Sequence, residues 1–192
     1  MSAFTLDPAT TALVLIDLQN GITAMQSHPY TAADVIGKAA TLARRFREVG
    51  APVVLVNVAF PVGPAALRPE ADVAMNLPAS VPPGWEDIVP ELGATADDVR
   101  VTKRQWGAFY GTALDLQLRR RGIKTIVLGG VATNIGVEST ARDAYEHGYN
   151  QVIVEDICAS TVSKEVHDFA FKIIFPRIAR VRSTDDVLQA LG

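Results

Sequence analysis

The chain contains 192 residues, of which 48% are hydrophobic and 20% are charged, and its formal net charge is −3. This length and apolar content suit one folded domain over residues 1–192 and exclude a largely disordered chain. The arginine cluster at 119–121 is the one basic run, and it lies near the end of an expected helix, where cations complement the helix dipole. We therefore expect no nucleic-acid partner.

The sequence also carries no sign of export or membrane insertion. No apolar run approaches the roughly 20 residues that a membrane-spanning helix needs, and residues 1–5 have no basic stretch ahead of a long apolar core. The single cysteine, Cys158, cannot form an internal disulfide. These features predict a cytoplasmic protein without a membrane partner.

Short, almost wholly apolar runs recur along the chain and predict the strands of a buried sheet. Continuous Val, Ile and Leu runs of this length are typical of parallel strands that are covered on both faces. The run at 99–102 is the weakest. The others cover residues 11–16, 52–58, 123–128, 151–154 and 178–181.

Amphipathic segments separate these runs and predict helices. Three of them, at 32–49, 112–121 and 134–147, stop at a glycine, which is the expected signal just past a helix. A fourth, at 163–174, is expected to be closed by Pro176. The alternation predicts an α/β protein with a Rossmann-like, doubly wound sheet of about six mainly parallel strands flanked by helices.

The stretch at 60–95 interrupts this alternation. It contains seven prolines and no clear hydrophobic period. Long irregular segments are uncommon in compact domains and are often functional. Three interpretations stay open: the segment covers an active site, it reaches across to a second subunit, or it is a variable surface excursion.

Three segments place candidate site residues at the carboxyl ends of predicted strands, where open α/β sheets bind ligands. Asp17 directly follows the first strand, so partial burial would raise its pKa and make it a usable proton donor or acceptor. Lys103 follows the run at 99–102 and could stabilise a carboxylate or hold Asp17 ionised. Gly136 lies in a strand-to-helix turn, where the backbone can approach a ligand closely and N–H groups favour an anion.

Each of these residues also has a purely structural interpretation. Asp17 could cap a turn. Lys103 could be a solvated lysine beside core aromatic residues, and Gly136 could permit tight packing of a helix on the sheet. No one of the three motifs is specific alone, so their combination carries the functional prediction.

Together the three segments resemble the isochorismatase-like, or cysteine hydrolase, family. The resemblance rests on Asp17 in a D-L-Q context, Lys103 followed by G-A-F-x-x-T-x-L, and V-A-T-x-x-G-V-x-S-T-A-x-D-A around Gly136. It covers about residues 10–191, and the K-R-Q-W-G-A-F-Y-G-T segment is similar to that of an uncharacterised bacterial hydrolase of the family. The resemblance implies that Asp17 and Lys103 are catalytic and that Gly136 occupies the position of the nucleophilic cysteine.

A glycine at this position changes the chemistry that the resemblance implies. Nicotinamidases, ureide amidohydrolases and carbamoylsarcosine-type enzymes of the family use a cysteine thiolate, which Gly136 cannot supply. Isochorismatases can carry glycine here, because they protonate a vinyl ether and add water without a nucleophilic side chain. The metal-binding Asp-x-His segment of nicotinamidases corresponds to residues 56–60, which hold neither histidine nor carboxylate. We therefore expect no metal and no cofactor.

Cys158 is a rival nucleophile in the segment after the run at 151–154. Reactive cysteines need an accessible, electropositive setting, so we expect Cys158 to be buried and inert. Its neighbour Asp156 is expected to cap a turn, and Arg142 and Asp143 are expected to be exposed or to support the fold.

The sequence therefore predicts a hydrolase that acts on a small, carboxylate-bearing substrate without covalent cysteine catalysis, with isochorismate-type vinyl-ether hydrolysis as the leading reaction. Asp17 is the expected general acid, and Lys103 is expected to hold the substrate carboxylate and tune Asp17. The resemblance also implies a cis peptide bond at Val131–Ala132 and a homo-oligomer. One alternative is a catalytically silent binding or regulatory protein that keeps the family pocket, and another is a hydrolase that acts on a different activated substrate with Asp17 as general base for water. Expected substrate-binding residues are Gln19, Trp106, Phe109, Tyr110, Val131, Ala132 and Thr133.

Overall fold

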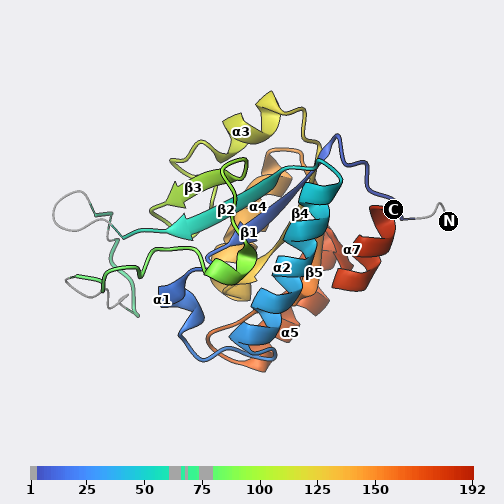
Figure 1. Ribbon diagram of the computed structural model, residues 1–192. Coiled ribbons are helices and arrows are strands. Elements are labelled where there is room, and N and C mark those ends of the chain that lie inside the picture. The colour runs from blue at the N-terminus through green and yellow to red at the C-terminus, as the bar shows by residue number, and fades with distance from the viewer. Residues whose placement is uncertain (1–3, 61–65, 68, 74–79) are drawn as a thin grey trace.

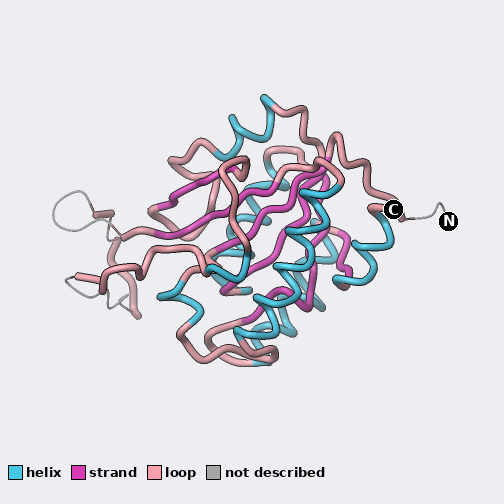
Figure 2. The backbone as a smooth tube through the Cα atoms, in the orientation of Figure 1, coloured by secondary structure: helices cyan, strands magenta, loops and turns pink. Residues whose placement is uncertain are grey.

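A computed structural model describes residues 4–60, 66–67, 69–73 and 80–192. Its centre is a six-stranded parallel sheet with the order β3-β2-β1-β4-β5-β6 (Figures 1 and 2). The strand order reverses between β1 and β4, which makes the carboxyl ends of these strands the expected ligand site. The strands are β1 (Thr11–Ile16), β2 (Val53–Val58), β3 (Val99–Lys103), β4 (Thr125–Val131), β5 (Asn150–Ala159) and β6 (Arg180–Arg182).

Helices cover both faces of the sheet, as the doubly wound prediction requires (Figure 1). One layer contains α2 (Ala32–Glu48) and α7 (Thr184–Ala190), and the other contains α3 (Leu114–Arg120) and α4 (Glu138–Glu146). The arginine cluster at 119–121 lies in and just after the last turn of α3. The remaining helical segments are α1 (Asn20–Thr23), η2 (Pro90–Leu92), η3 (Thr133–Val137), α5 (Lys164–Phe169), η4 (Ala170–Ile174) and α6 (Phe175–Ile178).

The strand β1 shows how the two layers share one sheet. Leu13 and Leu15 belong to the apolar cluster with α2, whereas Ala12, Val14 and Ile16 belong to the cluster with α3 and α4. Successive side chains of a strand point to opposite faces, so a strand buried on both sides needs a continuous apolar run. All six residues of β1 are buried.

Two helices begin with a capping box, which satisfies N–H groups of the first helical turn. At α2, the Thr31 side chain accepts from the N–H of Asp34, whose carboxylate accepts from the N–H of Thr31. Ser183 and Asp186 form the same arrangement at α7. The predicted helices do not include α7, although this Ser–Asp spacing is the signal that marks its start.

The helix expected to stop at Pro176 instead continues through it. α5 runs into η4, which is π-helical, and then into α6, which contains Pro176. Proline lacks the N–H that an α-helix needs in its interior, and the widened π-helical turn before it accommodates the missing bond. The expected helix end was therefore wrong.

β5 is longer than the run at 151–154 predicts. Its pairing with β4 shifts register after Leu128 and resumes with Gly130 opposite Cys158. Asp156 lies in this stretch and does not cap a turn as expected. Its carboxylate instead accepts from the N–H and hydroxyl of Thr184 and pairs with Lys38 at 2.8 Å. The polar residues Glu155 and Asp156 predict a turn, but both lie inside β5.

Only part of the irregular stretch at 60–95 can be followed, because residues 61–65, 68 and 74–79 lie outside the described residues. Its return, at 80–95, includes η2. No helix of the described part of the chain is long and apolar enough to cross a lipid bilayer.

Candidate active site

Asp17 lies at the carboxyl end of β1, in the middle of the edge where ligands bind. Its φ of 52° places it in the left-handed region, which aspartate tolerates better than most residues. The Asp17 N–H still donates to the carbonyl of Val56 at 2.9 Å. The pairing of β1 with β2 is thus kept while the chain turns sharply at Asp17.

Lys103 reaches Asp17 from β3, two strands away. Its Nζ lies 2.8 Å from Asp17 Oδ2 and donates to the carbonyl of Gln105 at 3.2 Å. Two strand spacings amount to about 10 Å, a width that needs a side chain as long as lysine. Both side chains are buried, so solvent and salt screen this ion pair little.

Gly136 approaches Asp17 from the other side, in the π-helical turn after β4. A Cβ built on Gly136 would lie 3.1 Å from Asp17 Oδ2 and 2.9 Å from Ile16 Cγ2. Glycine therefore lets this turn close on the carboxylate without displacing its neighbours. The cis peptide bond expected at Val131–Ala132 is present just before the turn.

Gly130 allows β4 to approach the backbone of β1 closely. Its φ is 134°, and a Cβ built there would lie 2.1 Å from the carbonyl oxygen of Ile16. Any other residue would push the two strands apart at the point where Asp17 leaves β1. The contact between Asp17 and the Gly136 turn thus depends on Gly130 as well.

Burial dominates the acid–base behaviour of Asp17. Loss of hydration raises the pKa of Asp17 to about 6, and the charge and hydrogen bond of Lys103 oppose this rise. Lys103 occupies Oδ2, whereas the buried Oδ1 has no hydrogen-bond partner among the described residues. A carboxyl group with one oxygen unpartnered and a pKa near neutrality is suited to giving and taking a proton.

Val131, Ala132 and Thr133, which are predicted to bind substrate, lead into the Gly136 turn, and all three are buried. Thr133 Oγ1 lies 2.9 Å from Nδ1 of His167. Burial lowers the pKa of His167 to about 4, so its ring is neutral at neutral pH. The Thr133 side chain therefore holds the turn against α5.

Gln19 supports the site instead of offering its amide to a substrate. Its Nε2 donates to the carbonyls of Val58 at 3.1 Å and Trp85 at 3.3 Å, and its Oε1 accepts from the N–H of Val58 at 2.7 Å. The residue is fully buried. Gln19 therefore does not offer its amide to substrate as predicted. It links the end of β1 to Val58 at the end of β2 and to Trp85 in the segment at 80–95.

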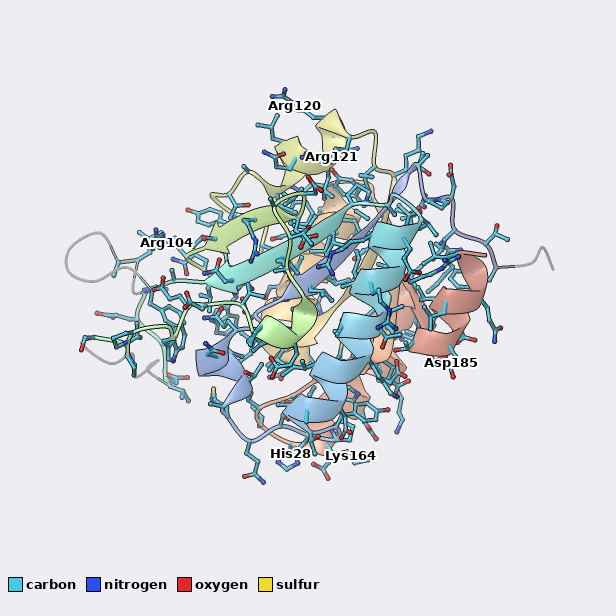
Figure 3. The ribbon with its side chains drawn as sticks, in the orientation of Figure 1. His28, Arg104, Arg120, Arg121, Lys164 and Asp185 are labelled. Carbon is cyan, nitrogen blue, oxygen red and sulfur yellow. The ribbon has the colours of Figure 1, made fainter. Side chains whose placement is uncertain are left out.

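The return of the 60–95 stretch packs beside the Asp17 loop. The N–H of Gly21 donates to the carbonyl of Trp85 at 2.9 Å. A Cβ built on Gly21 would lie only 2.0 Å from atoms of the Trp85 indole, so the ring packs directly on the glycine. The ring of Phe60 lies 5.7 Å from that indole. At the same edge, Arg104 is anchored to the carbonyl of Ala59 at 3.2 Å (Figure 3).

The three predicted aromatic contacts divide between the site and the core. The carbonyl of Trp106 lies 3.6 Å from the Cβ built on Gly136, whereas its side chain is 50% exposed, and that of Tyr110 is also exposed. Phe109 is buried and stacks on His147, 5.0 Å away. His147 follows the last turn of α4, roughly 15 Å along the helix from Gly136. Phe109 is therefore a core residue and not a wall of the site.

Cys158 is buried, as expected, but lies within β5 and not after it. Burial raises the pKa of its thiol far above the ordinary range. A protonated thiol without solvent contact is a poor nucleophile. Asp143 lies against Gly107, where a Cβ would be 2.6 Å from its Oδ2.

Comparison with known proteins assigns this fold and site to a family. The sequence matches the isochorismatase domain over residues 11–186. The chain belongs to the isochorismatase family. It is 53% identical over 188 residues to the uncharacterized isochorismatase family protein YecD of Escherichia coli O157:H7, with 97% of this chain and 98% of that protein covered.

A solved isochorismatase family protein from Burkholderia thailandensis shares the fold with a TM-score of 0.93 and 49% identity, over 99% of each chain. A more distant relative is the ureidoacrylate amidohydrolase RutB of Methylobacterium radiotolerans, at 31% identity over 214 residues, which cover 97% of this chain and 81% of that protein. The isochorismatase family thus includes proteins named as hydrolases.

Two residues of this isochorismatase-family site were missed in the sequence. Thr140 Oγ1 donates to the carbonyl of Gly136 at 2.6 Å and accepts from the N–H of Ala108 at 3.1 Å. A threonine four residues after Gly136 on a helix is the signal for the first bond. The carbonyl of Gln105, which binds Lys103, has no sequence signal because any residue supplies a carbonyl.

In the segment at 56–60, Asn57 makes hydrogen bonds within the protein. The Asn57 side chain donates to the carbonyl of Glu86 at 3.2 Å and accepts from the Thr102 hydroxyl at 2.8 Å. Among the residues that the structure describes, no three His, Cys, Asp or Glu side chains gather into a group that could hold a metal ion.

Proposed function

We propose that this protein is an isochorismatase-family hydrolase that cleaves a small, carboxylate-bearing vinyl ether without a thiol nucleophile and without a metal. The observation that carries the proposal is the contact between Gly136 and Asp17. A Cβ at position 136 would lie 3.1 Å from Asp17 Oδ2, so the position beside the acid bears no side chain at all. Backbone alone therefore faces a carboxyl group whose pKa is raised to about 6, and its Oδ1, which has no hydrogen-bond partner among the described residues, is the oxygen that would meet substrate or water.

Asp17 begins the reaction as the protonated acid. It transfers its proton to the terminal CH₂ carbon of the vinyl ether, and the ether oxygen stabilises the cation that forms on the neighbouring carbon. Water adds to that carbon and returns a proton to the Asp17 carboxylate. The resulting hemiketal breaks to release an alcohol and a 2-keto acid, so the net reaction consumes one water and regenerates the acid.

Lys103 has a second role in this mechanism. Its ammonium group has three N–H donors, and Asp17 Oδ2 and the Gln105 carbonyl occupy two of them. The third is available for the substrate carboxylate, which would bring the vinyl group to Asp17. Ile135 and Val137 donate their N–H groups to the Ala132 carbonyl, which leaves the earlier N–H groups of the turn for the substrate oxygen or the attacking water.

An amidase reaction, as in the ureidoacrylate amidohydrolase named above, fits this site less well. Covalent amide cleavage needs a nucleophilic atom beside the acid, and position 136 offers none. The buried thiol of Cys158 lies in β5, with its pKa raised by burial. Protonation followed by addition of water asks only for the groups that Asp17 and Lys103 supply.

The proposal is tested with 2-ethoxyacrylate, a small vinyl ether that carries a carboxylate. Hydrolysis in D₂O should give pyruvate with one solvent deuterium in its methyl group per turnover, measured by ¹H NMR against the slow exchange of pyruvate alone. Asp17→Asn should abolish the reaction. Equal turnover by that variant, or product without solvent deuterium, would contradict the mechanism.

The same assay separates the enzyme from a silent binding protein. If 2-ethoxyacrylate or a larger cyclic vinyl ether of the isochorismate type quenches tryptophan fluorescence but is never hydrolysed, the protein binds without turnover, and the enzymatic proposal fails. Trp85 and Trp106 both lie at the site edge, so bound ligand should change their emission.

A further inference from the structure

We propose that Thr140 is a positioning residue that locks the Lys103 loop against the Gly136 turn and thereby keeps Asp17 enclosed. Its single hydroxyl donates to the Gly136 carbonyl at 2.6 Å and accepts from the Ala108 N–H at 3.1 Å. A hydroxyl can do both at once, so one buried group joins two segments that approach Asp17 from opposite sides.

The link acts on the segment that covers Asp17. Ala108 ends a short stretch that begins at Lys103 and includes Gln105, the acceptor of Lys103 Nζ. The same stretch brings the Trp106 carbonyl to 3.6 Å from the Cβ built on Gly136. Fixing Ala108 on α4 therefore fixes both the lysine and the backbone that closes over the acid.

Gly107 gives a second, independent sign of this close docking. A Cβ built on Gly107 would lie 2.6 Å from Asp143 Oδ2, on the helical turn after Thr140. The loop thus presses on α4 where it has no side chain of its own. Asp143 Oδ2 is the end of a side chain that can rotate away, so Gly107→Ala keeps both hydrogen bonds of Thr140 and should leave the loop docked on α4.

The hydrogen bonds of Thr140 go to backbone groups of Ala108 and Gly136, so its effect on the acid and the lysine is through their enclosure. Burial is the main cause of the raised pKa of Asp17. When the link is lost and water reaches the carboxyl group, the pKa should fall toward its ordinary value. A change that merely lowered the overall stability of the protein would leave the titration of the folded molecules unaltered.

The first measurement needs no substrate and so does not depend on the proposed function. The Asp17 carboxyl is followed by ¹³C NMR during a pH titration of the parent, Thr140→Val, Thr140→Ser and Gly107→Ala. The midpoint should fall by about 0.5 unit or more in Thr140→Val and stay near the parent value in Gly107→Ala, which keeps the Thr140 link. Serine keeps the hydroxyl, so Thr140→Ser should stay near the parent.

The matched control is Thr41→Val. Thr41 Oγ1 donates to the carbonyl four residues earlier, Gly37, at 3.1 Å in α2, which is the same helical bond as that of Thr140. It lies outside the site, so its loss should leave the Asp17 midpoint unchanged. An unchanged midpoint in folded Thr140→Val, or an equal shift in Thr140→Ser, would overturn the assignment.

The second measurement rests on the proposed function. With 2-ethoxyacrylate, Thr140→Val should lower kcat about 10-fold or more and change KM little, because Thr140 makes no contact with substrate. Thr140→Ser should restore most of the rate. If no variant hydrolyses the probe but the Asp17 midpoint still moves as described, the positioning role stands and the proposed reaction fails. Loss of kcat that serine does not restore would overturn the positioning role.

Discussion

The carboxyl ends of β4 and β5 are neighbours, yet Gly136 after β4 and Cys158 in β5 have opposite surroundings. Gly130 of β4 pairs with Cys158 of β5, and the β4 chain then turns into Gly136. Gly136 lies beside the buried Asp17 carboxylate, which pairs with Lys103, but has no thiol. Cys158 has a thiol but is sealed within the core, and burial raises its pKa.

This difference shows that the setting of a residue decides its chemistry. A thiol becomes a nucleophile only as a thiolate, which needs a nearby base or cation and access to substrate. The Asp17 carboxylate lies at the Gly136 turn, whereas the thiol is buried in β5. Under the proposed function, the acid and the lysine act without a thiol, and this separation can be tested at each position.

The largest effect is expected from Asp17→Asn, which removes the titratable proton and nearly preserves shape. The rate of vinyl-ether hydrolysis should fall by at least the roughly 10²–10⁴-fold typical of general acid–base catalysis. Asp168→Asn, in an exposed ion pair with Lys164 on α5, is the control and should keep the parent rate (Figure 3 labels Lys164). Near-parent turnover by Asp17→Asn would show that this acid is structural.

The pH dependence should follow the protonated form of Asp17. Its pKa in the folded protein is raised to about 6, so the acid is present below that pH and is lost as pH rises through it. The value of kcat/KM should fall about 10-fold per pH unit above pH ~6, or roughly 100-fold by pH 8. A profile that rises through this range would instead make Asp17 a base.

Lys103→Met should weaken the site, because it replaces the cation with a neutral side chain of similar length. Loss of a charge-assisted hydrogen bond to substrate, about 1.5–3 kcal/mol, corresponds to roughly 10- to 150-fold in kcat/KM. The lysine also favours the ionised form of Asp17, so the falling limb of the pH profile should move to higher pH. Kinetics across pH measure both effects. A falling limb that stays at the same pH would show that Lys103 does not affect the pKa of Asp17.

Gly136→Ala tests the space beside the acid. The new Cβ would meet Ile16 Cγ2 at 2.9 Å and Asp17 Oδ2 at 3.1 Å. Overpacking of this kind costs about 1–3 kcal/mol in the free energy of unfolding, measured by denaturant titration. Hydrolysis should fall as well, because the methyl group crowds the Asp17 carboxyl group. Gly37→Ala, where a Cβ meets nothing within 4 Å, should be tolerated.

The smallest effect is expected at Cys158. Iodoacetamide should leave turnover of the native parent protein largely intact, because the thiol is buried and protonated. The measurement is activity after treatment, with alkylation followed by mass spectrometry. Inactivation that substrate prevents would promote Cys158 to the site.

The sheet and the centre of the site were readable from the sequence because their signals are local. Apolar runs predicted the strands, and the residues after them predicted Asp17, Lys103 and Gly136 at one edge. The structure brings these three together. Where a signal was ambiguous, prediction failed: Pro176 lies inside a helix, and the polar residues near Asp156 lie inside β5.

The supporting contacts were less readable because they depend on distant segments. Gln19 follows Asp17 closely and suggested a substrate contact, but its amide is used by Val58 and Trp85. Phe109 lies in the Lys103 motif, but its ring packs on His147. No local pattern encodes which partner such a side chain finds in the folded chain.

The most direct test places a thiol at each of the two positions in one molecule. Gly136→Cys is treated with iodoacetamide near pH 7, and mass spectrometry follows alkylation at positions 136 and 158 separately. The account predicts that the thiol at 136 reacts well above the rate of an unstructured peptide thiol with a pKa of about 8.5, that Asp17→Asn removes the enhancement, and that Cys158 stays unmodified. A thiol at 136 that reacts no faster than the peptide would mean that Asp17 and Lys103 do not converge on this turn, and the account would be wrong.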